Sequence, residues 1–223
     1  MKRLFDFTMA LVGILITWPI MLIVAILIKI TSKGPVLFKQ KRLTVGMKEF
    51  EIYKFRSMRT DYDKEGRGIQ TKGSSSVITP IGKIIRKTKL DELPQFFNII
   101  KGDMSFVGPR PELPRRLQYY TDEQKEMFSV RSGISSPASI VFSDEEYLMN
   151  QVKDPEKFYI EQIMPYKIEL NKYYVDNQSF WGDIRIIVVT LLKIIKKIDN
   201  NRIVNDMALL TKYDLLSNSV KDY

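Results

Sequence analysis

The stretch MALVGILITWPIMLIVAILI, residues 9–28, decides the fold because it is long, apolar and interrupted near its centre by Trp18-Pro19. The only charged residue between positions 4 and 28 is Asp6. A straight helix of about 25 residues, at ~1.5 Å per residue, is long enough to cross a hydrocarbon core of ~30 Å. An interior proline removes a helix hydrogen bond and clashes with the preceding turn, so the helix is expected to bend at Pro19.

Basic residues flank both ends of this apolar run. Lys2 and Arg3 precede it, and Lys29 and Lys33 follow it. Lysine and arginine mark the cytoplasmic side of membrane segments, so both ends are expected on one face. We therefore predict a re-entrant membrane hairpin over residues 1–33. A kinked single-pass anchor is the open alternative, because membrane helices tolerate proline.

The composition of the 223-residue chain limits its chemistry. The chain has no cysteine and no histidine, which excludes disulfides, zinc sites built on these residues and every Ser-His or Cys-His mechanism. The formal net charge of +9 is uneven, since residues 1–116 hold 22 basic and 10 acidic side chains and residues 117–223 hold 13 and 16. No nucleic-acid-binding motif is present. We expect the basic half to face lipid headgroups or a phosphorylated substrate, and we expect no nucleic acid partner.

Short strand and helix patterns predict an α+β fold, with a small mixed helical and β-hairpin catalytic domain over residues 34–200. Strand-like runs at 36–38 and 50–55 flank a turn at 45–48 and indicate the hairpin. Thr79-Pro80 is typical of a helix start and predicts a helix through about Lys87.

The other segments are less specific. Residues 61–76 are polar with glycines and predict a loop, and residues 201–223 predict a polar tail. Residues 181–197 are mostly apolar and end in lysines. That pattern fits a helix lying in the membrane interface, with burial in the core as the equal alternative.

The acidic dyad Asp91-Glu92 opens a second predicted helix, which ends at Gly102. On local sequence alone, Asp91 could be an N-cap and Glu92 a partner of the helix dipole. Cations favour a phosphate site instead, because Arg86 lies upstream and Arg110 lies downstream between two prolines. The planar fork of arginine suits bidentate phosphate binding, and a carboxylate among cations can attack a phosphoryl group or hold Mg²⁺.

Two more basic residues are candidates for anion binding. Lys54 and Arg56 lie two residues apart at the end of the second predicted strand. Their alternative interpretation is a solvated basic strand face.

Five stretches resemble the bacterial sugar transferases called monotopic phosphoglycosyl transferases. The matching region covers roughly residues 2–135, in the order found in that family. The matching stretches are KRLFD at 2–6, GPVLFKQ at 34–40, KFRSM at 54–58, LDELPQ at 90–95 and MSFVGPRP at 104–111.

The resemblance implies a membrane enzyme of defined chemistry. It implies a re-entrant helix broken at Trp18-Pro19, an aspartate nucleophile matched by Asp91, a partner carboxylate matched by Glu92, and Mg²⁺. The implied reaction transfers a phospho-sugar from a UDP-sugar to polyprenyl phosphate and releases UMP. The implied location is the cytoplasmic face of the bacterial inner membrane, and the implied role is the first membrane step of glycoconjugate or polysaccharide assembly.

One region departs from the family pattern and leaves the sugar open. Many members have Pro-Gly-Ile-Thr-Gly where this chain has SGISSPASI at 132–140. Two rival functions also remain at this stage: a membrane-anchored scaffold or regulator that binds nucleotide or lipid phosphate without turnover, and an ordinary glycosyltransferase that releases UDP. A second copy of the chain is a further partner left open.

Overall fold

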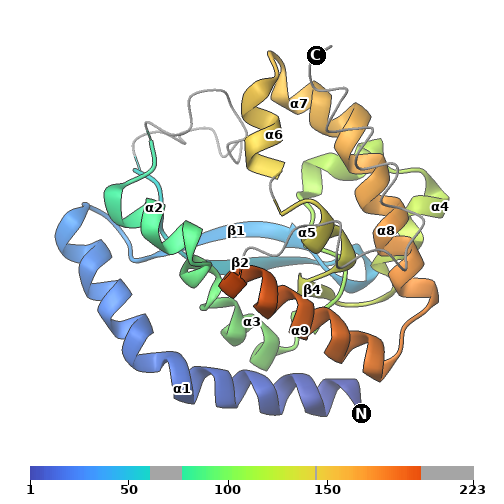
Figure 1. Cartoon of the computed structure of the whole chain (residues 1–223). Coiled ribbons are helices and arrows are strands. Elements are labelled where there is room, and N and C mark those ends of the chain that lie inside the picture. The colour runs from blue at the N-terminus through green and yellow to red at the C-terminus, as the bar shows by residue number, and fades with distance from the viewer. Residues whose placement is uncertain (61–76, 144, 197–223) are drawn as a thin grey trace.

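The computed structural model describes residues 1–60, 77–143 and 145–196, and it shows a mixed α and β fold with a long apolar N-terminal helix and two small sheets (Figure 1). The predicted loop at 61–76 and the predicted tail at 201–223 lie outside the described residues.

The elements follow one another along the chain in an irregular order of helices and short strands. The helices and strands are α1 Lys2–Thr31, β1 Leu37–Leu43, β2 Glu49–Phe55, α2 Pro80–Lys87, α3 Gln95–Lys101, β3 Met104–Val107, α4 Asp122–Lys125, β4 Ser132–Ser135, α5 Pro137–Val141, α6 Glu145–Gln151, α7 Pro155–Phe158, α8 Met164–Asp176 and α9 Phe180–Lys196. Short 3-10 turns lie at Val45–Met47, Leu90–Glu92, Pro114–Tyr119 and Glu126–Ser129, and a π-helical turn lies at Tyr159–Ile163.

The predicted β-hairpin is confirmed. β1 and β2 pair antiparallel, from Leu37 opposite Phe55 to Leu43 opposite Glu49. Gly46 in the connecting turn has a φ of 66°, a left-handed conformation that glycine adopts without a Cβ clash. The hairpin therefore follows from local sequence.

The helix predicted to begin at Thr79-Pro80 is also confirmed. The Thr79 hydroxyl accepts a hydrogen bond from the Gly82 N–H at 3.0 Å, and Pro80 occupies the first position of α2. The cap satisfies one of the unpaired N–H groups at the start of the helix. Gly82 also allows a close approach, since a Cβ there would lie 2.0 Å from the Ser57 carbonyl oxygen.

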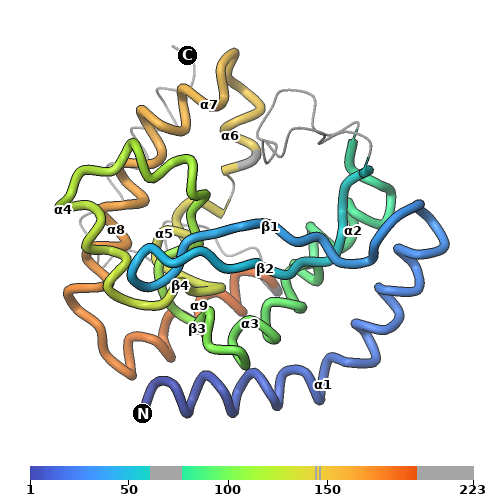
Figure 2. Tube along the Cα trace, turned by 180° about the vertical axis from the view of Figure 1, so that it is seen from behind, coloured from blue at the N-terminus to red at the C-terminus, as the bar shows by residue number. Residues whose placement is uncertain are grey.

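Helix α1 is one long helix that bends part-way along its length. It runs along one edge of the molecule beside α3 and then turns toward α2 (Figures 1 and 2). Pro19 inside the helix has no N–H to donate, and the Thr17 hydroxyl donates to the Gly13 carbonyl at 2.7 Å. Both features bend helices. The structure thus describes a continuous bent helix over the segment predicted as a hairpin, and within the described residues α1 is the one helix long and apolar enough to span a membrane.

One stripe of α1 packs against the domain, and the rest of its apolar surface is exposed. Ala10 joins a buried cluster with Ile99 of α3, and Ile28 joins another with Ile85 of α2. At Gly13 a Cβ would lie 2.8 Å from the Phe96 ring, so glycine permits this close packing. The large apolar side chains left exposed on α1 include Leu15, Ile16, Trp18, Leu22, Ile23 and Ile26.

The largest buried cluster lies away from α1 and is built mainly from the C-terminal half of the chain. It contains Phe128, Val141, Phe158, Ile163 and Ile168, among others, from the turn before β4 and from α5, α7, the π-helical turn and α8. This core holds α5, α7 and α8 together. The second sheet, in which β3 and β4 pair in parallel, contributes no residue to it.

Helix α9 makes polar contacts with β4 and α5 and keeps an apolar face exposed. The Thr190 hydroxyl shares a hydrogen bond with the Ser135 hydroxyl of β4, and the Lys193 ammonium donates to the Ile140 carbonyl of α5. The helix predicted at 181–197 is therefore confirmed as α9, Phe180–Lys196. The rest of the domain covers one side of it. Its exposed apolar side chains include Trp181, Val188, Leu191 and Ile194.

The start of α1 is fastened to the domain by three charged side chains. Arg3 donates to the carbonyls of Ile99 and Ile100 at the end of α3, where helix carbonyls lack partners. Asp6 is buried and accepts a hydrogen bond from the Phe106 N–H at 3.1 Å. We call Lys2, Arg3 and Asp6 the N-terminal latch. A single acidic residue within an apolar run indicates that its carboxylate bonds to another part of the chain, because an unpaired carboxylate is costly in lipid.

The contact of Lys2, the third residue of the latch, stabilises the fold, so removing it should lower the stability. Lys2 forms an ion pair with Asp183 of α9, and the Tyr174 hydroxyl donates to the same carboxylate at 2.7 Å. We expect Asp183→Asn to lower the free energy of unfolding by roughly 1–3 kcal/mol, because a charged, buried acceptor is lost. Denaturant titration in detergent measures the change. Glu49→Gln, which breaks the exposed Lys41–Glu49 pair, is the control and should change little; equal losses in the two variants would contradict the latch.

Candidate functional site

Charged side chains from separate elements meet just before the N-terminal end of α3. Strand β2 supplies Lys54, the 3-10 turn Leu90–Glu92 supplies the acidic dyad, and the segment after β3 supplies Arg110. The positive charges of Arg86 in α2 and of Lys89 also favour the ionised form of Asp91 and so oppose the rise of its pKa. We call these residues the charge cluster: Lys54, Arg86, Lys89, Asp91, Glu92 and Arg110.

Glu92 is the centre of the ion pairs in this cluster. Its Oε1 atom accepts from the Lys54 Nζ at 2.7 Å and from the Arg110 Nη2 at 2.7 Å. The Glu92 side chain is largely buried, with 13% of its surface exposed. Charge-assisted hydrogen bonds of this length are strong, so Glu92 fixes the positions of two cations from distant parts of the chain.

Asp91 has no such partners among the described residues. It is 8% exposed, and its Oδ1 atom is buried without a hydrogen-bond partner. Neither the 3-10 turn, whose N-cap is Lys89, nor α3, whose N-cap is Pro94, has a side-chain cap. The prediction that the helix starts at Asp91 is therefore wrong, because a 3-10 turn precedes α3, and the alternative of Asp91 as an N-cap fails with it.

The two carboxyl groups of the dyad have opposite pKa shifts. Burial raises the pKa of Asp91 above its ordinary value, and the neighbouring charge of Glu92 raises it further against the pull of the nearby cations. Burial acts in the same direction on Glu92, but Arg110, Lys54 and Lys89 outweigh it and hold the pKa of Glu92 well below its usual range. Carboxyl pairs whose pKa values are driven apart are typical of sites in which the two groups have different roles.

The ion pairs with Glu92 also affect the pKa values of Lys54 and Arg110. Burial lowers the pKa of Lys54, although Glu92 opposes the shift. The charge of Glu92 raises the pKa of Arg110, so its guanidinium stays charged. The site thus holds two positive charges beside the dyad, both bonded to the Glu92 Oε1 atom, and such a group of cations suits an anion such as a phosphate.

Arg56 makes its hydrogen bonds away from the charge cluster, and its role as a substrate ligand stays a prediction. Its guanidinium is buried and donates to the carbonyls of Ser32 at 2.9 Å and Lys33 at 2.8 Å, just past the end of α1. It also donates to the Ser32 hydroxyl at 2.7 Å. Arg56 therefore caps α1, and the alternative of a solvated strand face is wrong for it.

The donor set around Asp91 fits a magnesium ion shared with a substrate. Within the described ranges, no group of three or more His, Cys, Asp or Glu side chains clusters in the way a protein-only metal site requires. Asp91 nevertheless has a buried carboxylate oxygen without a hydrogen-bond partner among the described residues, while the bonded oxygen of Glu92 is occupied by two cations. Mg²⁺ commonly takes one or two carboxylates, several waters and substrate phosphates, and Asp91 could supply the protein ligand.

Sequence reasoning missed the N-terminal latch and the amides of α3. The sequence identifies Lys2 and Arg3 as flanking charges and as part of the KRLFD motif, and neither pattern indicates that both bind the domain. Asn98 of α3 bridges to β2 by accepting from the Tyr53 N–H and donating to the Glu51 carbonyl. The single acidic residue of the apolar run could have indicated the latch, but no local pattern indicates the Asn98 bridge.

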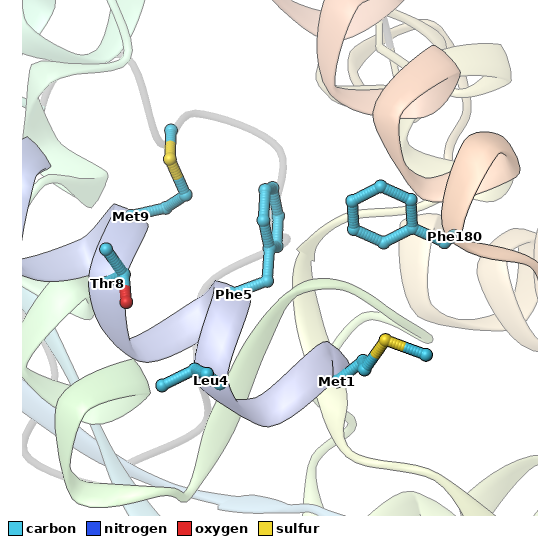
Figure 3. Close-up of a pocket in the computed structure, with 6 residues that line it drawn as sticks. All are labelled: Met1, Leu4, Phe5, Thr8, Met9 and Phe180. Atoms are coloured by element: carbon cyan, nitrogen blue, oxygen red, sulfur yellow. The ribbon is translucent and has the colours of Figure 1, made fainter.

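An apolar pocket of about 320 Å³ lies between the start of α1 and Phe180 of α9 (Figure 3). It is lined by the first turns of α1 and by Phe180, whose ring meets Phe5 edge-on at 5.4 Å between ring centroids. Arg3, beside these lining residues, reaches the last carbonyls of α3, whereas the dyad precedes its first residue. The pocket is therefore separate from the charge cluster.

Comparison with known proteins then decides the family. The sequence model described as "Bacterial sugar transferase" matches residues 1–197. The chain belongs to this family. The resemblance stated from the motifs is thereby confirmed, and so, at the level of the family, is the expectation of a sugar transferase.

Relatives in the family carry names for related reactions. The chain is 39% identical over 201 residues to a UDP-N-acetylgalactosamine-undecaprenyl-phosphate N-acetylgalactosaminephosphotransferase of Aeromonas hydrophila, covering 87% of this chain and 43% of the relative. It is 36% identical over 200 residues to a UDP-glucose:undecaprenyl-phosphate glucose-1-phosphate transferase of Xanthomonas campestris pv. campestris, covering 87% and 38%. The sugar transferase EpsL of Bacillus subtilis (strain 168) is 36% identical, with 87% of each chain covered. The chain thus spans less than half of the two longer relatives and most of EpsL.

Proposed function

We propose that this chain transfers a phospho-sugar from a UDP-sugar to polyprenyl phosphate and releases UMP, as the first membrane step of glycoconjugate or polysaccharide assembly. One observation carries the proposal: Asp91 is an unpaired carboxylate among cations, while its neighbour Glu92 is neutralised by Lys54 and Arg110. The names of the relatives, which specify UDP-sugars and undecaprenyl phosphate, support the same reaction class.

In the first step, a carboxylate oxygen of Asp91 attacks the β-phosphorus of the UDP-sugar. The bond between this phosphorus and the bridging oxygen breaks, UMP leaves, and an aspartyl phospho-sugar remains. Arg110 and Lys54 offset the negative charge on the phosphoryl oxygens, and Arg86 steadies the departing phosphate. Asp91 would be the protein ligand of Mg²⁺, whose chemical contribution would be further charge neutralisation.

In the second step, a phosphate oxygen of the polyprenyl phosphate attacks the same phosphorus. The bond to the Asp91 carboxylate breaks, which regenerates the enzyme and gives a polyprenyl diphosphate sugar. Glu92 takes no covalent part, because its bonded oxygen already holds Lys54 and Arg110. We assign it the role of positioning these cations.

The nucleotide product tests the proposal. Purified chain incubated with a UDP-sugar, polyprenyl phosphate and Mg²⁺ should release UMP, because the bond broken is on the β-phosphorus. Chromatography separates UMP from UDP. Release of UDP would indicate an ordinary glycosyltransferase, and binding without turnover would indicate a scaffold or regulator. A panel of UDP-sugars in the same assay identifies the sugar.

The exposed apolar surfaces support a membrane position for the proposed reaction. We propose that α1 enters the inner membrane from the cytoplasmic face and returns to it, and that the exposed face of α9 lies in the interface. The bend in α1 and the basic residues at both of its ends favour re-entry. Trp181 is 77% exposed, which suits the headgroup level that tryptophan prefers.

Cysteine labelling tests this topology cleanly because the chain contains no native cysteine. One cysteine replaces Lys33, and another is placed in a short extension before Met1, since Lys2 itself is engaged with Asp183. We expect both to react with an impermeant reagent only from the cytoplasmic side of oriented vesicles. Labelling of either cysteine from the periplasmic side would support the single-pass alternative.

A further inference from the structure

Gln95, the first residue of α3, has a buried side chain whose amide nitrogen lacks a hydrogen-bond partner. The residue is 1% exposed, and its Nε2 atom is among the buried polar atoms left unsatisfied in the described part of the chain. Leaving a buried donor unpaired costs about 1–3 kcal/mol. Such groups are rare in folded proteins and call for an explanation.

The position of Gln95 relates it to the dyad. It follows Glu92 by three residues and Asp91 by four, across a turn in which Leu93 and Pro94 have right-handed helical backbone angles and the Leu93 N–H donates to the Leu90 carbonyl at 3.3 Å. Side chains at these spacings are neighbours, with Cβ atoms about 5–6 Å apart. Two residues four apart along this turn therefore each carry a buried atom without a hydrogen-bond partner among the described residues: a donor on Gln95 and an acceptor on Asp91.

Asn98, one turn further along α3, shows that burial of an amide on this helix can have a structural reason. It is fully buried, its Oδ1 accepts from the Tyr53 N–H at 2.9 Å, and its Nδ2 donates to the Glu51 carbonyl at 2.7 Å. Both ends of that amide are used to hold α3 on β2. Gln95 has no comparable bridge, so fold stability does not account for its amide.

We infer that Gln95 is a further catalytic residue, whose side-chain amide donates a hydrogen bond to a non-bridging oxygen of the phosphate that reacts at Asp91. The inference rests on the proposed function. A phosphate brings acceptor oxygens for Gln95 and an electrophilic phosphorus for Asp91, so one ligand satisfies both groups. A neutral donor also adds a contact to the reacting phosphate without adding a cation that would compete with Lys54 and Arg110 for Glu92.

Gln95→Met tests the inference, because methionine has a similar length and no donor. If the amide stabilises the transition state, kcat for UMP release should fall by about 100-fold, the lower end of the effect of removing one preorganised donor. The KM for the UDP-sugar should change by less than about threefold, since the contact strengthens in the transition state. The midpoint of thermal unfolding should stay equal or rise, because an unsatisfied buried donor is removed.

Asn98→Leu is the matched control, since it removes an amide that holds the fold, and it should lower the thermal midpoint. Wild-type chain with UDP-sugar alone must first show the phospho-sugar mass on Asp91; without it, the proposed function fails and this inference with it. If the mass forms and Gln95→Met keeps the wild-type kcat, the inference alone is overturned. The inference is also overturned if Gln95→Met loses activity only in proportion to a lower thermal midpoint, which would indicate a structural role. A shift of the acidic limb of the pH profile with an unchanged plateau kcat would overturn it as well, because Gln95 would then act through Asp91.

Discussion

Asp91→Asn should abolish UMP release, lowering the rate by at least about 1,000-fold while the fold persists. Asparagine keeps the shape of the side chain and removes the nucleophilic charge. The fold should persist because the buried Oδ1 of Asp91 accepts no hydrogen bond that the variant would lose. UMP release and the midpoint of thermal unfolding measure the two effects. Asp122→Asn, at an exposed acid paired only with Lys125 in a surface ion pair, is the control and should retain full activity.

Trapping the intermediate makes the role of Asp91 specific. Incubation with UDP-sugar alone should add the mass of one phospho-sugar to the peptide that contains Asp91, and Asp91→Asn should show none. The same mass on another residue, or UMP release that strictly requires both substrates together, would falsify the covalent route.

The pH dependence of this adduct follows from the raised pKa of Asp91. Only the ionised carboxylate attacks, so the initial rate of adduct formation should rise with pH through a value above the ordinary aspartate pKa. A raised pKa also means that the folded chain binds this proton better than the unfolded chain, so its contribution to stability is lost as the pH rises through the folded value. Asparagine does not ionise, so Asp91→Asn does not lose stability as the pH rises in this way. The variant should be at least as stable as wild type at neutral pH.

Glu92→Gln should have the second largest effect, because it leaves Lys54 and Arg110 without a counter-charge. We expect UMP release to fall by about 100-fold or more as the two cations lose their fixed positions. We expect the free energy of unfolding to fall by roughly 1–3 kcal/mol, between the values for exposed and fully buried pairs, because all three side chains are partly buried. Denaturant titration of Glu92→Gln, Arg110→Gln and the double variant measures the coupling. Strictly additive losses would contradict the ion pair.

The stability difference between wild type and Glu92→Gln should also depend on pH. The pKa of Glu92 is depressed in the folded chain, so its stabilising contribution is present above the ordinary glutamate value and is lost as the pH falls toward the folded value. The difference should therefore be largest near neutral pH and should shrink below about pH 4.3. A difference that stays constant over this range would indicate that the charge of Glu92 contributes nothing.

Local sequence determined the elements whose causes lie within a few residues. The hairpin around Gly46, the capped start of α2 at Thr79 and the end of α3 at Gly102 were all predictable, because turn conformations and helix caps depend on the nearest residues. The apolar run around Pro19 similarly predicted a long helix. The candidates Asp91, Glu92, Lys54, Arg86 and Arg110 came from charge patterns and motifs. The structure joins Lys54, Glu92 and Arg110 by ion pairs next to Asp91, and Arg86 acts on Asp91 through its charge.

Only the tertiary structure decided how each charge is used. Lys54 and Arg56 are two residues apart, yet one binds Glu92 and the other caps α1. Their side chains serve different partners, 38 and 24 residues away in sequence. Asp91 and Glu92 are adjacent and chemically alike, and their pKa values diverge because cations from distant segments reach Glu92 with hydrogen bonds and Asp91 only at longer range. Burial and long-range contacts set the free energy of a charge, and neither is encoded in the few residues around it.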